Sequence, residues 1–281
     1  MDDDKYPPET GRRRFVKGVV GSASLAGVGT AASTALTAAT SKPGTTGGPT
    51  TYVGIRNTDG PAPRGMPLVP LTVDDDGYLK GIWPEPQDVE LQSGETVTVA
   101  REEMGELTYS GRWFQYCGVQ QAKGVQPTVE QDNYLRAAPG TFDWQDEMEL
   151  GQKLHVDDFD DYETWGNGVG EAGLGKPAQA TWRSQSGEDE DVTPLPVQVV
   201  RSTRVPELPA ESQYTEFLNA ATERGFIAWL DKCTHFCCVP EFKAEGSAKF
   251  GAQNQVYCQC HQSVYDPFSP TKRSFTALPR D

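Results

Sequence analysis

The sequence predicts a mainly β protein that follows an N-terminal segment able to span a membrane or to direct export. Turn-forming residues recur throughout, with 29 Gly and 21 Pro in 281 residues, and such a chain favours short strands joined by turns. Runs such as Thr96-Val97-Thr98-Val99 alternate polar and apolar side chains with the period of a half-buried strand. Residues 18–41, in contrast, carry no charged side chain.

The N-terminus carries a motif for export. Arg12-Arg13-Arg14-Phe15-Val16-Lys17 resembles the twin-arginine signal R-R-x-F-[LV]-K, so we assign residues 1–17 to a cytoplasmic N-terminus. The 24 residues of segment 18–41 would reach about 36 Å as a helix, enough to cross a hydrocarbon core of about 30 Å. A strict Ala-x-Ala cleavage site is absent, which favours a retained transmembrane anchor over a cleaved signal segment.

Two segments follow for which the sequence indicates structure but no function. Residues 42–51 are rich in Gly and Pro and have little to bury, so they are expected to form a hinge linker. Residues 52–174 are expected to form strands and loops around a small aromatic core, and no motif assigns them a role. The lone His155 in this region is expected to be a surface or structural residue.

The length fits an anchor plus either one domain with a large insertion or two small domains, and residues 175–281 are expected to form a domain. Ala178–Trp182 and Val197–Arg201 are predicted to pair as strands. A helix is predicted within 209–224, because Tyr214, Phe217, Leu218 and Ala221 share one helical face and Gly225 can stop it. Phe226–Leu230 is then a buried strand that leads into the first of two metal-ligating motifs, and Val256-Tyr257 leads into the second.

These motifs are Cys233-Thr234-His235 and Cys258-Gln259-Cys260-His261. Thiolate ligands select zinc, cuprous copper or iron–sulfur clusters, and imidazole binds zinc, copper and iron. A mononuclear zinc site with two Cys and two His is one interpretation. The other is a Rieske 2Fe-2S centre, in which two His replace two Cys on one iron. A zinc site has no use for the additional Cys238 and Cys260.

Here the chain resembles the Rieske iron–sulfur proteins of cytochrome bc-type quinol oxidases, whose two boxes read C-T-H-x-G-C and C-P-C-H-G-S-x-Y-D. The corresponding segments are 233–238 and 258–266. The resemblance implies that residues 175–281 adopt the Rieske iron–sulfur fold, antiparallel β-sheets with a cluster-binding subdomain, behind the N-terminal transmembrane helix or export signal.

The resemblance also implies roles for individual residues. Cys233 and Cys258 would bind one iron, and His235 and His261 the other. Cys238 and Cys260 would form a disulfide between the two loops. Ser263 and Tyr265 would donate hydrogen bonds to cluster and ligand sulfur atoms, which stabilises the reduced cluster and raises its potential. Two cysteines are left over, and a second disulfide between Cys117 and Cys237 is a further possibility.

Several positions depart from the family pattern. Cys237 and Gln262 stand where the family has Gly, and Gln259 replaces Pro. The Gly-Pro-Ala-Pro segment that usually covers the cluster on its far side in the family is missing, with only Ala277-Leu278-Pro279 left near the terminus. The surface that faces the quinone is therefore expected to differ from that of the family.

The function implied is that of an oxidoreductase subunit of the quinol–cytochrome c reductase type. It would accept an electron and a proton from quinol, with His261 as the proton-accepting contact and His235 similarly exposed. The expected partners are a cytochrome b-type subunit, quinol, and a cytochrome c or small blue copper protein as acceptor. The export motif and a disulfide beside the cluster place the cluster domain outside the cell membrane, to which the N-terminal helix anchors it.

Two other functions remain open. An exported Rieske subunit of a molybdenum enzyme, such as arsenite oxidase or a nitrate-respiration partner, would have the same cluster and signal. A Rieske ferredoxin would have the ligands but normally neither the disulfide nor the export segment.

Composition bears on the environment of the protein. The net charge is −15, from 25 basic and 40 acidic residues, which argues against nucleic acid as a partner. Such an excess of acid suits solubility in very high salt, where self-repulsion is screened, and it predicts a halophilic archaeal source. An ordinary acidic surface is the alternative.

Overall fold

The computed structural model describes residues 47–91, 93–165, 175–184, 194–211, 213–243 and 254–280, and the predicted mainly β architecture is confirmed for this part of the chain. The twin-arginine motif and the expected anchor at 18–41 lie outside the described residues. Among the described residues, no helix combines the length and the apolar character that a membrane span requires.

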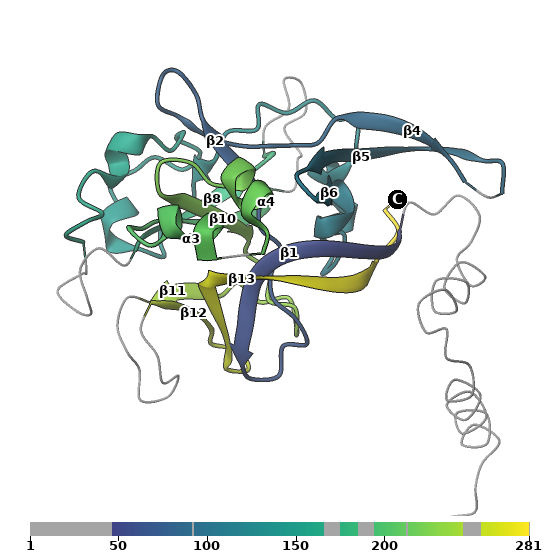
Figure 1. Cartoon of the computed structure of the whole chain (residues 1–281). Coiled ribbons are helices and arrows are strands. Elements are labelled where there is room, and N and C mark those ends of the chain that lie inside the picture. Colours follow the sequence, from purple (N-terminus) through teal and green to yellow (C-terminus); the bar gives the residue numbers. More distant parts are fainter. Residues whose placement is uncertain are drawn as a thin grey trace, which may run out of the picture. The chain divides into compact units, whose positions relative to one another are not determined.

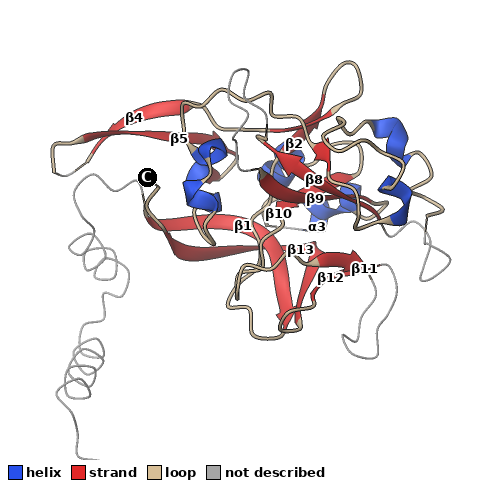
Figure 2. Ribbon diagram, turned by 180° about the vertical axis from the view of Figure 1, so that it is seen from behind, coloured by secondary structure: helices blue, strands red, loops and turns tan. Residues whose placement is uncertain are grey.

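The structure contains short helices and antiparallel strands (Figures 1 and 2). The strands are β1 (Gly48–Asp59), β2 (Leu71–Val73), β3 (Leu79–Gly81), β4 (Pro86–Glu90), β5 (Thr96–Met104), β6 (Leu107–Ser110), β7 (Arg136–Ala137), β8 (Lys176–Trp182), β9 (Leu195–Arg201), β10 (Phe226–Leu230), β11 (Glu241–Lys243), β12 (Gln255–Cys258) and β13 (Ser263–Ala277). The helices are α3 (Leu208–Glu211), α4 (Thr215–Ala221) and the 3₁₀ helices η2 (Gly111–Phe114), η3 (Val119–Gln121), η4 (Lys123–Val125), η5 (Asp143–Gln145), η6 (Val156–Phe159) and η7 (Val205–Glu207).

The first four-stranded sheet has the order β1-β13-β12-β11 and joins the two ends of the described chain. Figure 1 shows β1 and β13 running side by side along most of their length, with Gly48 opposite Ala277 and Asp59 opposite Val264. Residues 48–51, expected to be linker, are therefore the first part of β1. Because β13 also pairs with β12, this sheet holds the second cluster motif at one end.

The second four-stranded sheet has the order β10-β9-β8-β7. The expected pairing of the strands around 178–182 and 197–201 is present, with Ala178 opposite Val199. β10 pairs with β9, and every residue of β10 is buried, as its run of apolar side chains predicts. The predicted helix is present as α4, which covers only Thr215–Ala221 of the predicted range 209–224. Gly225 follows with a φ of 82°, a backbone conformation that favours glycine.

A three-stranded sheet has the order β4-β5-β6, and its strands β4 and β5 form a long hairpin that extends from the rest of the fold (Figure 2). The alternation in Thr96–Val99 has the expected result, because Val97 and Val99 are buried while Thr96 is exposed. β2 and β3 form a separate two-stranded sheet.

The described residues, from 47 to 280, form one compact unit. The segments before and after residue 174 share sheets and core, because β1 pairs with β13 and β7 pairs with β8. Large aromatic side chains fill this common core, among them the fully buried Trp113, Trp182 and Trp229. The described residues of segment 52–174 are thus an integral part of the body that carries the two candidate metal-ligating motifs.

Candidate metal centre

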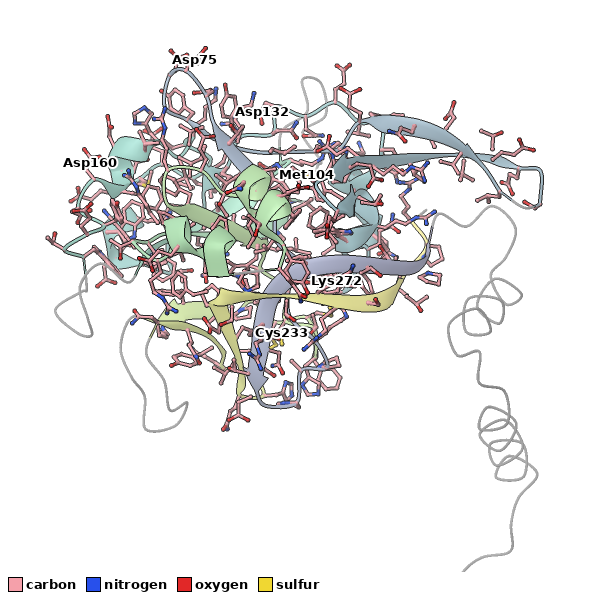
Figure 3. All side chains as sticks on the ribbon, in the orientation of Figure 1. Asp75, Met104, Asp132, Asp160, Cys233 and Lys272 are labelled. Atoms are coloured by element: carbon pink, nitrogen blue, oxygen red, sulfur yellow. A yellow bond between two sulfur atoms is a disulfide. The ribbon has the colours of Figure 1, made fainter. Side chains whose placement is uncertain are left out.

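The two candidate metal-ligating motifs, at residues 233–238 and 258–266, lie at two loops of the fold. The first loop, residues 231–240, connects β10 to β11. The second loop, residues 259–262, is the turn between β12 and β13, with Cys258 paired to Ser263 at its base. β11 pairs with β12, so the strand after the first loop and both strands beside the second loop belong to one sheet, whereas β10, which precedes the first loop, belongs to the other four-stranded sheet. Figure 3 labels Cys233 of the first loop.

The two cysteines of the expected ligand set are the free thiols of the described chain, and both are buried. Burial raises the pKa of Cys258 to about 11, and the adjacent Cys233 thiol raises it as well, while backbone N–H groups of Cys260 and His261 oppose this effect. Two adjacent buried thiols resist ionisation unless a cation replaces their protons. This pair is therefore suited to a metal rather than to free thiolate.

The two imidazoles lie together at the surface end of the same site. The ring centroids of His235 and His261 are 4.7 Å apart, and the rings are nearly perpendicular. His261 is exposed and His235 is half-buried. The Nδ1 atom of His235 is buried without a hydrogen-bond partner, which leaves this atom available as a ligand. Thiols inside and imidazoles outside form an asymmetric donor set.

Two disulfides hold the first loop. Cys238 is bonded to Cys260, with Cα atoms 6.7 Å apart, and this bridge joins the two loops. Cys117 is bonded to Cys237 and ties the first loop to the segment between η2 and η3. Both bridges considered from the sequence are present. Through the second one, a residue of segment 52–174 directly supports the candidate centre.

The sulfur atoms of Cys238, Cys258 and Cys260 lie within 4.8 Å of one another, which by distance alone resembles a three-cysteine metal site. Two of these sulfurs are bonded to each other, however, and a disulfide supplies no thiolate. The free donors are instead Cys233, Cys258 and the two imidazoles.

Of the two hydroxyl side chains expected to donate to sulfur atoms, that of Tyr265 contacts a ligand-candidate cysteine, whereas that of Ser263 contacts the backbone. The Tyr265 hydroxyl is buried and lies 3.1 Å from the Cys233 sulfur. Burial raises the pKa of Tyr265, and the contact with Cys233 raises it further. The hydroxyl therefore keeps its proton and can donate a hydrogen bond to a ligand thiolate. Ser263 Oγ is also buried and accepts a hydrogen bond from the backbone N–H of Ala62 at 3.1 Å. Its own hydrogen remains available to a further acceptor.

That contact corrects one expectation from the sequence. Gly60-Pro61-Ala62-Pro63 has the Gly-Pro-Ala-Pro pattern that was missing after the second motif, and the structure places it against the loops from the other end of the chain. The Thr234 hydroxyl donates to the carbonyl of Arg64, so this segment contacts both loops. We call residues 60–65 the cover segment. The Gly-Pro-Ala-Pro pattern at residues 60–63 can be found in the sequence, but only the pairing of β1 with β13 brings it to the site.

Gly60 is required by the close approach of two backbones. Its φ is +81°, and a Cβ atom built there would lie 2.4 Å from the carbonyl oxygen of Gln262 and 2.6 Å from the Cα of Ser263. No side chain fits at these distances, and L-residues disfavour this φ. Glycine at this position therefore lets the cover segment lie directly on the second loop.

The two departures from glycine in the loops have a structural cost. Cys237 and Gln262 both adopt positive φ, 63° and 64°, as the glycines of the family pattern would. For an L-residue this conformation costs roughly 1–2 kcal/mol. At Cys237 the disulfide to Cys117 holds the residue in place, whereas Gln262 is exposed and has its backbone N–H bonded to the Cys258 carbonyl at 2.9 Å.

The third histidine lies apart from this site. His155 contacts the carbonyl oxygen of Asp76 through Nε2 at 2.7 Å, and its Nδ1 accepts from the N–H of Asp157 at the start of η6. It is thus a structural residue, as expected.

Comparisons with protein-family models, with curated proteins and with solved structures find no match for this chain. The assignment of a function therefore rests on the residues and geometry of the site.

Proposed function

We propose that this protein is the electron-transfer subunit of a membrane quinol oxidase complex and holds a Rieske 2Fe-2S centre between its two loops. Cys233 and Cys258 would bind one iron, and His235 and His261 the other. The observation that carries the proposal is the arrangement of two free buried thiols and two adjacent imidazoles in loops joined by the Cys238–Cys260 bridge.

The donor set supports this centre over a single zinc ion for a chemical reason. Four of the six cysteines are bonded in disulfides that hold the loops, and the two that remain free are buried side by side. A zinc site binds all four donors around one point and needs no additional bridge between its loops. In the Rieske arrangement thiolates and imidazoles belong to different irons, which suits thiols on the inner side and imidazoles on the outer side.

A Rieske centre supplies a one-electron acceptor whose imidazole ligands can also bind a proton. The protein would orient the quinol that donates both the electron and the proton. The exposed His261 ring would accept the hydrogen bond of a quinol hydroxyl and hold the proton that it releases. Tyr265 would donate to the Cys233 sulfur and so favour the more negative reduced state. The cover segment would exclude water from the opposite side of the loops.

The surface beside the imidazoles suits a quinol ring. Phe236 is 65% exposed, and its ring centroid lies 4.3 Å from that of His235 and 5.0 Å from that of His261. An exposed aromatic side chain next to two hydrogen-bonding imidazoles can contact the apolar ring and the hydroxyl of a quinol together. The other partners proposed are a cytochrome b-type subunit and, as acceptor, a cytochrome c or a small blue copper protein.

The cluster is tested by electron paramagnetic resonance of the reduced full-length protein. A rhombic 2Fe-2S spectrum is expected, and His261→Ala should abolish it. His155→Ala is the matched control, since that imidazole lies apart from the loops, and it should leave the spectrum unchanged. A silent protein that contains one zinc per chain would overturn the proposal, as would an unchanged spectrum in His261→Ala.

The quinol function is tested by measuring the midpoint potential of the cluster and by using a hydroquinone as its electron donor. Rieske centres span about −150 to +300 mV, and a subunit that oxidises quinol should lie in the upper part of this range. Reduction of the cluster by a hydroquinone should be slower in Phe236→Ser than in the unmodified protein. A potential near the lower limit would favour the Rieske ferredoxin instead. A high potential without any effect of a hydroquinone would favour the molybdenum-enzyme subunit.

A further inference from the structure

A second candidate site lies away from the loops, where the β4–β6 sheet meets the ends of β1 and β13. A hollow of about 470 Å³ is lined there by three cationic side chains, Arg101, Arg112 and Lys272, and by one carboxylate, Glu106. Lys272 is labelled on β13 in Figure 3. The cations come from three separate segments, so that only the tertiary fold assembles them.

The charge of this hollow is opposite to that of the whole protein. Three cations and one carboxylate give the lining a net charge of +2 (3 − 1), whereas the chain carries −15. None of the three cations forms an ion pair with a described carboxylate. An excess of like charges in one hollow is unfavourable by itself, more so where part of it is buried.

Arg112 shows this cost most clearly. Burial lowers its pKa, and the nearby Arg101 lowers it further. The pKa of Arg280 is lowered to about 10, mainly by burial and also by Arg112, so that a third guanidinium contributes to the local positive field. The Nε atom of Arg112 is buried without a hydrogen-bond partner. A buried guanidinium N–H without an acceptor is costly, and an acceptor that enters the hollow would offset this cost.

The remaining lining indicates the kind of anion. Arginine side chains bind phosphate oxygens with two parallel N–H donors, and a lysine adds a compact charge. The hydroxyl of Thr50 offers a further donor, while Val99 and Leu107 supply an apolar wall. A lining charge of +2 matches a dianion such as hydrogen phosphate, and the apolar wall can contact a group attached to it.

We propose that this hollow binds a phosphate group, with Arg101, Arg112 and Lys272 as its ligands. The phosphate can be a free phosphate compound or the headgroup of a phospholipid, and the chemistry recognised is the same. The site is independent of the metal centre, because none of its lining residues belongs to the two loops.

The test is equilibrium dialysis of the full-length protein, in detergent, against radiolabelled inorganic phosphate at constant ionic strength. One phosphate per chain should bind saturably. Arg101→Gln and Lys272→Gln change exposed residues, and each should weaken the affinity by about tenfold or more, because each removes a charged hydrogen bond. Arg56→Gln is the matched control: it removes one exposed positive charge elsewhere on β1 and should leave the affinity unchanged.

A second arm identifies the source of the phosphate. The protein is placed in nanodiscs of phosphatidylcholine alone or with phosphatidylglycerol, and the dialysis is repeated. Weaker apparent binding of inorganic phosphate with phosphatidylglycerol means that a headgroup occupies the hollow. Equal binding in both discs assigns the site to a free phosphate compound. Absence of saturable binding, or equal losses in Arg101→Gln and Arg56→Gln, would overturn the proposal.

Discussion

Replacing Gly60 with alanine tests whether the cover segment lies on the second loop. In Gly60→Ala the new Cβ would stand 2.4 Å from the Gln262 carbonyl oxygen and 2.6 Å from the Ser263 Cα, both of them backbone atoms. Neither neighbour can rotate away as a side chain could. Relief requires the cover segment and the second loop to separate, which would also lengthen the Ala62–Ser263 hydrogen bond.

The magnitude follows from two effects. A φ of +81° costs an alanine roughly 1–2 kcal/mol, and forcing an extra carbon into a packed contact adds typically about 1–3 kcal/mol. Gly94→Ala separates the two effects, because Gly94 has a φ of +80° but a Cβ added there would meet nothing within 4 Å. We therefore expect Gly60→Ala to be less stable than Gly94→Ala by about 1–3 kcal/mol.

The assay is chemical unfolding followed by circular dichroism, together with the rate of loss of visible absorption from the proposed 2Fe-2S cluster. Gly60→Ala should unfold at a lower denaturant concentration than Gly94→Ala and should lose the proposed cluster faster. Equal stability and equal metal retention in the two variants would refute the placement of residues 60–65 on the second loop.

Three further predictions concern the loops themselves. Tyr265→Phe removes the hydroxyl that lies 3.1 Å from the Cys233 sulfur and should lower the midpoint potential by about 40–60 mV, since 59 mV corresponds to about 1.4 kcal/mol for one electron; voltammetry that shows no decrease, with Tyr109→Phe as a control away from the loops, would contradict the role of the hydroxyl. Gln262→Gly relieves a positive φ of 64° and should stabilise the protein by about 1 kcal/mol in denaturant unfolding, whereas a loss of stability would mean that the glutamine side chain contributes more than the strain. The double variant Cys238→Ala, Cys260→Ala opens a bridge between residues 22 apart, for which chain entropy gives roughly 3 kcal/mol, and should lose the metal faster in high salt; an unchanged rate would show that the bridge does not constrain the loops.

The amino-acid sequence by itself determined the local structure of the part that carries the motifs. The apolar run Phe226–Leu230 forms a buried strand, and the 3.6-residue pattern around Phe217 and Leu218 forms a helix. Such patterns depend on neighbours within a few residues, so the printed sequence contains what is needed to predict them. The spacing of the cysteines and histidines likewise indicated which side chains to expect in two facing loops.

Only the tertiary structure decided which distant segments meet these loops. Gly60-Pro61-Ala62-Pro63 reaches Ser263 across 201 residues, and Cys117 reaches Cys237 across 120 residues. Both contacts depend on strand pairing between β1 and β13 and on the shared core, which bring together segments that no local pattern relates. The phosphate hollow has the same origin, since Arg101 and Lys272 become neighbours only when β5 and β13 are in place. Register and packing over the whole fold, rather than local propensity, select these neighbours.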